Sequence, residues 1–281
     1  MPELQTSPVP AISMELRLDE RGIWCSNSRD AISYPEDGNH ICFQLEDASY
    51  WFQHRNTCII SMMSRFPPTG PVVDIGGGNG YVTRAMLDQG FQAILLEPGY
   101  AGALNAKLHR GVSEVICSDL KNARFLANSV AAVGLFDVLE HIEDDRGFVR
   151  NLHEILKPDG LLYATVPAHN WLWSQSDVHA GHFRRYNRRM LERSLGPEFR
   201  LEWFSYLFGP LTIPIFLLRS IPTRLGLGRQ KKVLGDQAEH GTSGGVSVNV
   251  MKWLLAREAR TIIQGRSTSV GTSCLFVARK R

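Results

Sequence analysis

The chain has 281 residues, of which 43% are hydrophobic and 21% charged, and its formal net charge is +3. This composition is that of an ordinary globular protein, and the charge is too small to indicate nucleic acid as a partner. The five cysteines form no C-x-x-C pair, the N-terminus lacks the basic and apolar run of a secretory signal, and the longest apolar stretch is broken by Pro214. The expected location is therefore the cytoplasm.

The first 45 residues mix Pro, Asp, Gly and Asn with short apolar pieces, which predicts an irregular or weakly stranded lead-in. Residues 46–66 are expected to form a helix, because apolar side chains recur there at helical spacing. Beyond the prolines at 67 and 68, strands alternate with helices up to residue 166. The expected strands are 72–75, 91–96, 115–117, 130–136 and 161–166, with two more at 200–206 and 272–278.

Strand and helix alternation of this kind predicts an α/β fold with a doubly wound, mostly parallel sheet. Ligands of such sheets bind at the carboxyl ends of the strands, near the point where the strand order reverses. Residues 207–268 separate the last two expected strands and are interpreted as a lid-like insertion. The chain is thus expected to consist of the lead-in, 1–45, and one domain, 46–281.

A glycine-rich turn follows the first expected strand, in the sequence Val-Val-Asp-Ile-Gly-Gly-Gly-Asn-Gly at 72–80. Gly76, Gly78 and Gly80 let the backbone approach a ligand closely, because no Cβ stands in the way. Glu97 ends the second strand, where an acid can accept both hydroxyls of a ribose. A dinucleotide would require a glycine at position 81 or 83, and those positions hold tyrosine and threonine. The unit therefore predicts a nucleoside cofactor other than a dinucleotide.

This Gly-x-Gly-x-Gly spacing, preceded by Asp74 inside the strand, resembles the first motif of class I S-adenosylmethionine-dependent methyltransferases. The Asp-Val-Leu-Glu-His string at 137–141 resembles the fourth motif of their ubiquinone-type, bacterial small-molecule branch. The resemblance covers 46–206 and the last strand. It implies a Rossmann-like sheet of seven strands with an antiparallel last strand, and S-adenosylmethionine as the cofactor. The implied cofactor-binding residues are Asp74, Gly76, Gly78, Gly80, Glu97, Asp119, Leu120, Phe136 and Asp137.

Within that set the resemblance implies separate roles. Asp119 would take the adenine amino group and Leu120 would contact the ring, although a plain helix cap is the alternative for the acid. Phe136 and Asp137 would flank the cofactor near its sulfonium. The aromatic string at 50–55 is expected either to close over the cofactor or to pack in the core.

Residues after the fifth strand are expected to bind the acceptor, because this polar and aromatic loop follows a strand end. The candidates are Trp171, Arg184, Arg185 and Tyr186. The two arginines could hold a carboxylate or phosphate, or else simply begin a basic helix. A neutral histidine suits the removal of a proton from a phenol or alcohol, and the candidates in order are His141, His182 and His169.

Some ubiquinone-type enzymes place a divalent metal on a Glu-x-x-Glu-His pattern at the fourth motif. Here Asp137 occupies the first position, and its side chain is shorter than that of glutamate. The only three candidate ligands, Asp137, Glu140 and His141, crowd one turn. No metal is therefore predicted.

The sequence predicts a methyltransferase that transfers a methyl group from S-adenosylmethionine to a small-molecule acceptor, with oxygen as the expected nucleophile. Carbon or nitrogen methylation of a lipid- or saccharide-linked substrate stays open, as does a non-catalytic cofactor-binding partner subunit. Residues 209–232 are interpreted as a hydrophobic lid or as a weak peripheral contact with an anionic membrane surface. The acceptor and the oligomeric state are not specified by the sequence.

Overall fold

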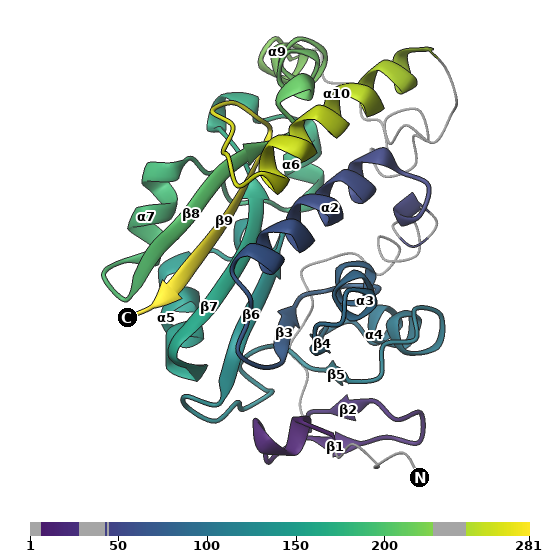
Figure 1. The fold of residues 1–281 in the computed structure, drawn as a ribbon, viewed down its shortest axis with the longest axis vertical. Coiled ribbons are helices and arrows are strands. Elements are labelled where there is room, and N and C mark those ends of the chain that lie inside the picture. Colours follow the sequence, from purple (N-terminus) through teal and green to yellow (C-terminus); the bar gives the residue numbers. More distant parts are fainter. Residues whose placement is uncertain (1–6, 28–42, 44, 227–245) are drawn as a thin grey trace.

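The computed structural model describes residues 7–27, 43, 45–226 and 246–281 (Figure 1). The basic residues at 229, 231 and 232, which belong to the interpreted lid, lie outside the described residues. One sheet of nine strands runs through the described part, in the order β1-β2-β5-β4-β3-β6-β7-β9-β8. The strands are β1 (Arg17–Leu18), β2 (Trp24–Cys25), β3 (Val72–Ile75), β4 (Ala93–Leu96), β5 (Val115–Cys117), β6 (Val130–Phe136), β7 (Leu156–Pro167), β8 (Phe199–Leu207) and β9 (Ser273–Lys280).

The five central strands, β5-β4-β3-β6-β7, are parallel, and β9 is antiparallel to both of its neighbours, β7 and β8. The mostly parallel, doubly wound α/β sheet with an antiparallel last strand is therefore confirmed. Chain order runs one way from β3 to β5 and the other way from β6 to β7. A crevice at the carboxyl ends of β3 and β6 is the expected ligand site in such a sheet.

The predicted count of seven strands is wrong, because β1 and β2 extend the sheet at the edge beside β5. Strand β2 pairs with β5 in parallel through Trp24 and Ile116, and β1 pairs with β2 in antiparallel. Each added strand has only two residues, too few to show the alternation by which strands are recognised in a sequence. The carboxylate of Asp19 forms the turn between them by accepting hydrogen bonds from the backbone N–H groups of Arg21 and Ile23.

Helices cover both faces of the sheet, which explains why β3 and β6 consist entirely of buried residues. On one face α2 and α10 lie side by side and contribute Met62 and Leu255 to a shared core (Figure 1). On the other face α5 and α7 contribute Leu152 and Leu191. The helices are α2 (Tyr50–Arg65), α3 (Tyr81–Asp88), α4 (Tyr100–Leu108), α5 (Asp145–Ile155), α6 (Gln175–Ala180), α7 (Arg188–Leu195), α8 (Thr212–Ile215), α9 (Ile221–Arg224) and α10 (Val246–Ile263).

A buried carboxylate on α10 ties the insertion to the rest of the fold. Glu258 accepts hydrogen bonds from the backbone N–H groups of Phe208, at 2.6 Å, and Gly209, at 2.7 Å. Its Oε1 atom also lies 2.8 Å from Nε2 of His54 on α2. The turn after β8, helix α10 and helix α2 are therefore held at one point.

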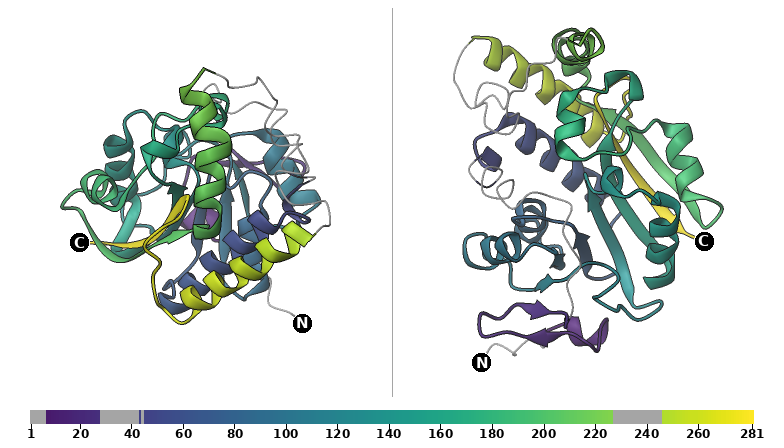
Figure 2. Two further views of the ribbon diagram at one scale, coloured as in Figure 1. Left: turned by 90° about the horizontal axis from the view of Figure 1, so that it is seen from above. Right: turned by 180° about the vertical axis from the view of Figure 1, so that it is seen from behind.

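The chain between β8 and α10 continues from a 3-10 turn, Gly209–Leu211, into α8, a π-helical segment, Phe216–Ser220, and α9. We call residues 212–224 the roof helix. Seen from above, it is the green stretch that crosses over the sheet (Figure 2, left). Among the described residues, no helix combines the length and the apolar character that crossing a bilayer requires.

Candidate cofactor and acceptor site

A cavity of about 590 Å³ lies at the carboxyl ends of the central strands, beneath the roof helix. This volume is within the range of small-molecule sites in proteins. Its walls come from α2, the glycine-rich turn, the end of β4, the segment after β6 and the loop between α6 and α7. Of the nine predicted cofactor-binding residues, those that line the cavity are Asp74, Gly76, Gly78, Glu97, Phe136 and Asp137.

The glycine-rich turn has the backbone that its composition indicates. Gly76, Gly78 and Gly80 have φ angles of 68°, 55° and 78°, a left-handed region that side chains with a Cβ rarely adopt. Gly77 is required for a different reason, since a Cβ there would stand 2.3 Å from Cδ1 of Leu95 and 2.8 Å from Oδ2 of Asp74. The turn is therefore closed against β4 from behind and open toward the cavity.

Two buried carboxylates flank this turn. Glu97 accepts hydrogen bonds from the backbone N–H groups of Gly78, at 2.9 Å, and Gly99, at 2.8 Å. Burial raises the pKa of Glu97 to about 7, although these two donors oppose the rise. Asp74 accepts a hydrogen bond of 2.6 Å from the hydroxyl of Thr83, and burial raises its pKa to about 6. A ligand that donates hydrogen bonds to either acid would therefore favour its ionised form.

Three predicted cofactor residues are not in the cavity lining. Gly80 is the N-cap of α3, and a Cβ there would stand 2.8 Å from Cβ of Ala106, so its role is to allow α3 and α4 to pack closely. Asp119 accepts hydrogen bonds from the backbone and side chain of Asn122, but these close a turn at 120–124, and no helix begins there as the alternative in the sequence had supposed. Leu120 is half-buried against the core beside it.

An ion pair across the cavity was not predicted from the sequence. Arg55 of α2 pairs with Asp137, and its guanidinium lies 4.8 Å from the ring centroid of Trp51 and 5.3 Å from that of Phe52. Asp137 also accepts a hydrogen bond of 3.0 Å from the hydroxyl of Thr165. The predicted aromatic string at 50–55 thus covers the cavity, but its arginine gives the contact that reaches the sheet.

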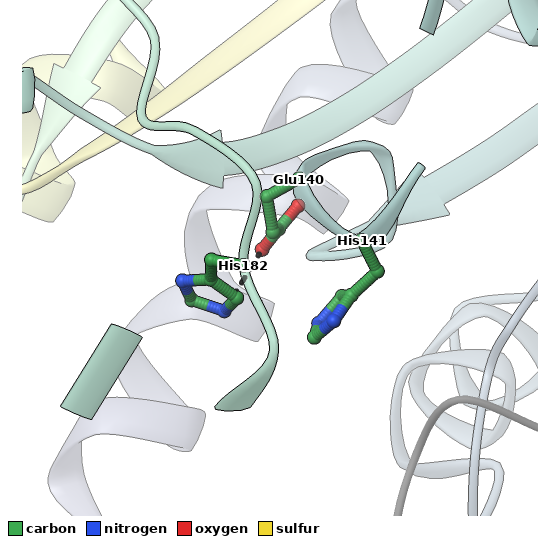
Figure 3. A group of neighbouring side chains, drawn as sticks. All are labelled: Glu140, His141 and His182. Atoms are coloured by element: carbon green, nitrogen blue, oxygen red, sulfur yellow. Dashed lines mark ion pairs between the residues drawn. The ribbon is translucent and has the colours of Figure 1, made fainter. Parts of the chain in front are cut away.

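Two histidines and a glutamate meet in the wall of the cavity (Figure 3). Glu140 and His141 come from the turn after β6, and His182 comes from the facing loop. The rings of His141 and His182 are 4.8 Å apart between centroids, and Nε2 of His182 lies 4.0 Å from Oε1 of Glu140. On its other side, Nδ1 of His182 lies 2.9 Å from Oδ1 of the buried Asp177.

The environment of this cluster determines its protonation. Burial, together with the neighbouring His182, lowers the pKa of His141 to about 4, so that His141 is neutral at neutral pH. Burial and the nearby Asp137 raise the pKa of Glu140 well above its ordinary range. Because these groups lie within a few ångströms of one another, their protons are coupled rather than independent.

The same three side chains could also hold a metal ion, since one ligand atom from each lies within 4.8 Å of the others. This set differs from the pattern weighed in the sequence, because Asp137 is paired with Arg55 and His182 takes its place. Asp177 would orient His182 for such a role, as carboxylates often orient ligating histidines. Three ligand groups from the protein would leave further coordination positions to solvent or substrate.

Of the predicted acceptor-binding residues, Arg185 lines the cavity, where its Nε lies 2.7 Å from Oδ1 of Asp177. The others are not in the lining. Tyr186 is fully buried, and its hydroxyl donates toward the backbone of Leu139 and the carboxylate of Asp145. Arg184 donates to backbone carbonyls at 142 and 143.

The remaining two predicted residues stack on each other outside the cavity lining. His169 lies between the rings of Trp171 and Tyr206, with centroid distances of 5.4 Å and 4.7 Å. The structure therefore brings His141 and His182 together and leaves His169 apart from them.

The sheet order, the glycine-rich turn and the acid at the end of β4 define a class I S-adenosylmethionine-dependent methyltransferase. The chain belongs to the family described as "Methyltransferase domain", whose profile matches residues 50–206. The predicted enzyme class and the predicted cosubstrate, S-adenosylmethionine, are thereby confirmed.

A curated relative is the ubiquinone biosynthesis O-methyltransferase of Pseudomonas aeruginosa, 28% identical over 101 residues. The match covers 34% of this chain and 43% of that protein, so the chain spans less than half the length of the relative.

Solved structures with the same fold include a putative methyltransferase of Haloferax volcanii in complex with the Trm112 activator. It has a TM-score of 0.56 and 16% identity, and the match covers 89% of this chain and 99% of that one. Phosphoethanolamine N-methyltransferase 2 of Haemonchus contortus has a TM-score of 0.53 and 18% identity, and the match covers 89% of this chain and 58% of that one. Geranyl diphosphate C-methyltransferase of Streptomyces coelicolor has a TM-score of 0.50 and 14% identity, and the match covers 79% of this chain and 76% of that one. Identities this low show a shared fold.

Proposed function

We propose that this enzyme methylates a hydroxyl oxygen of a small acceptor that binds beside His141 and His182. The observation that carries the proposal is the pair of histidines in the cavity, one of them held by a buried carboxylate. An alcohol or phenol must lose a proton as its oxygen attacks, and a positioned histidine is the side chain best suited to accept it. The O-methyltransferase among the relatives is consistent with this acceptor.

The cofactor end of the cavity lies between the glycine-rich turn and Glu97. Glu97 would accept hydrogen bonds from the two ribose hydroxyls, and the turn would let the backbone lie against the ligand. S-adenosylmethionine supplies an electrophilic methyl group when bound. The protein then has to align the acceptor with it and keep water out, which a roofed cavity does.

We assign to His182 the role of accepting the proton of the hydroxyl group. The sequence had placed His141 first for this role. The contact between Asp177 and Nδ1 of His182 keeps a proton on that nitrogen and leaves Nε2 with a lone pair directed toward Glu140 and the cavity. The carboxylate also stabilises the imidazolium that forms, as in the Ser-His-Asp arrangement. His141 has a pKa of about 4 and is therefore a weak base, although it is neutral and can orient the acceptor.

Carbon or nitrogen methylation is the alternative on the same fold, and solved relatives named above act on both kinds of atom. A carbon or amine acceptor depends less on a base, so its rate should change little when His182 is replaced. The family assignment favours an enzyme over a non-catalytic partner subunit.

The test is to identify the product. Candidate acceptors would be incubated with S-adenosylmethionine that carries an isotope-labelled methyl group, and the product examined by NMR. A labelled methoxy group supports the proposal, and a label on carbon or nitrogen contradicts it.

A further inference from the structure

The outward side of the roof helix exposes an apolar surface that the enzyme activity does not explain. Ile213, Leu217 and Leu218 are 69%, 52% and 75% exposed, and Leu225 directly after the helix is 66% exposed. Single exposed leucines are common on proteins, but a cluster within 13 residues marks an interaction surface.

The inward side of the same helix faces the cavity. Ile215 and Arg219 of the roof helix line it together with Leu211 just before the helix, and the three recur every fourth residue, as one face of a helix does. The cavity and the exposed apolar surface therefore lie on opposite sides of the same helix.

The roof helix is held by direct contacts to the segment 171–175. Nη2 of Arg224 donates to the backbone carbonyl of Trp171 at 2.9 Å, and Oγ1 of Thr223 accepts from the backbone N–H of Gln175. The ring of Phe216 contacts that of Trp171 edge to face, with centroids 5.3 Å apart. Because Trp171 is itself exposed, it extends the apolar surface beyond the roof helix to the segment 171–175.

All charges in this part of the chain have one sign. The sequence from 203 to 235 contains no aspartate or glutamate, and Arg224 is exposed beside Leu225. Exposed apolar side chains beside an arginine, in a stretch without acids, resemble the arrangement by which amphipathic segments bind anionic bilayers. Because no acid in this stretch would repel it, an anionic bilayer is the occupant that the apolar and basic side chains favour.

We propose that the roof helix docks the enzyme on an anionic membrane surface, and that the acceptor carries an apolar chain that reaches the cavity from the bilayer. We define the docking surface as Trp171, Ile213, Leu217, Leu218, Arg224 and Leu225. The second part of this proposal rests on the proposed function and narrows its acceptor to a lipid-like molecule. The docking itself does not depend on which atom is methylated.

The experiment is co-sedimentation of the protein with vesicles of phosphatidylcholine alone and of phosphatidylcholine with about one part phosphatidylglycerol in four. The double variant Leu217→Asp, Leu218→Asp tests the surface. The matched control is Leu108→Asp, since Leu108 is 59% exposed at the end of α4, in a different part of the molecule (Figure 1).

The wild type and the control are expected to bind the anionic vesicles at least about tenfold more tightly than the double variant. Binding should weaken as NaCl is raised from about 0.05 M to about 0.5 M, because salt screens the arginine contacts. Equal binding by wild type and double variant, or no binding by either, would overturn the proposal. So would a dimer of the wild type that the double variant dissolves, since the surface would then bind a second copy of the chain.

Calorimetry with S-adenosylhomocysteine separates this proposal from the proposed function. The double variant should bind the nucleoside as the wild type does, because neither leucine lines the cavity. Loss of vesicle binding with retained nucleoside binding supports docking. An isotope label found on carbon or nitrogen would overturn the oxygen acceptor and leave the docking result standing.

Discussion

The carboxylate of Asp177 lies 2.9 Å from Nδ1 of His182 and 2.7 Å from Nε of Arg185. It is buried in the first turn of α6, where it also accepts the backbone N–H of Ser174. These partners hold the pKa of Asp177 below its usual value against the opposing effect of burial, which is the largest single influence. A carboxylate that is ionised at neutral pH therefore orients the histidine that faces the cavity.

Replacing His182 with alanine should lower kcat by about a hundredfold while leaving the KM for S-adenosylmethionine nearly unchanged. His141→Ala should cost less than about tenfold, because that residue is proposed to orient the acceptor and not to take its proton. Steady-state kinetics on the identified acceptor would measure both. A larger loss in His141→Ala than in His182→Ala would reverse the assignment.

Asp177→Asn tests the positioning role. The amide removes the charge that stabilises the imidazolium, and its N–H group favours the wrong tautomer of His182. We expect kcat to fall by about a hundredfold and the acidic limb of the pH–rate profile to move to lower pH, because the imidazolium loses its stabilising charge. A fall in kcat with an unchanged pH profile would indicate that Asp177 only supports the fold of α6.

The attachment of α10 predicts a stability effect without a catalytic one. Glu258→Ala leaves the N–H groups of Phe208 and Gly209 and the ring of His54 without their acceptor, which should cost about 3 kcal/mol of unfolding free energy. Glu192→Ala removes an exposed acid paired with Arg188 and should cost less than about 0.5 kcal/mol. Denaturant unfolding of both variants is the measurement, and equal costs would show that the buried contacts contribute little.

Substitutions at Gly77 and Gly90 distinguish the effect of steric crowding from the effect of a left-handed backbone conformation. Gly77→Ala places a methyl group 2.3 Å from Leu95, so the glycine-rich turn must shift, and nucleoside affinity should fall by about tenfold or more. Gly90→Ala meets no atom within 4 Å but has a φ of 80°, so it should cost about 1 kcal/mol of stability and leave affinity unchanged. Calorimetry and thermal unfolding of both variants check this, and a normal affinity in Gly77→Ala would show that the turn is not part of the site.

The raised pKa of Glu97 predicts how cofactor binding depends on pH. Two ribose hydroxyls donate to the ionised carboxylate, so binding should strengthen as pH rises from about 5 to about 7 and level off above that. The unliganded protein should behave in the opposite sense. A carboxyl with a raised pKa supports the folded state at low pH, and that contribution is lost as pH rises through about 7.

Calorimetric titrations with S-adenosylhomocysteine across this pH range would measure the first effect. In Glu97→Gln the pH dependence should be largely lost. An affinity that falls with rising pH in the wild type would contradict the role assigned to Glu97.

The parts of this fold that could be predicted are those where local chemistry decides the structure. The apolar run of β3, the three left-handed glycines and the acid at the end of β4 are each readable within a few residues. Strands β1 and β2 were not readable, because a two-residue strand is defined by its partner. The pairing between Trp24 and Ile116 depends on residues 92 positions apart.

The site shows the same division. His141 follows directly from its motif, whereas the pair formed by Arg55 and Asp137 joins two elements that only the tertiary fold brings together. Tyr186 was predicted to bind the acceptor but is fully buried. In the sequence, a tyrosine beside basic residues resembles a surface residue, because its burial depends on the tertiary fold. One local signal was available for Asp177, because Ser174 stands three positions before it in a capping box.

Cofactor binding in this cavity is tested most directly by calorimetry of S-adenosylhomocysteine binding to the wild type and to Glu97→Ala, at about pH 8, where Glu97 is ionised. We expect one nucleoside bound per wild-type chain and an affinity at least about tenfold lower in the variant, with thermal unfolding showing that the variant is folded. No binding to the wild type, or equal affinity in a folded Glu97→Ala, would contradict the placement of the cofactor in this cavity.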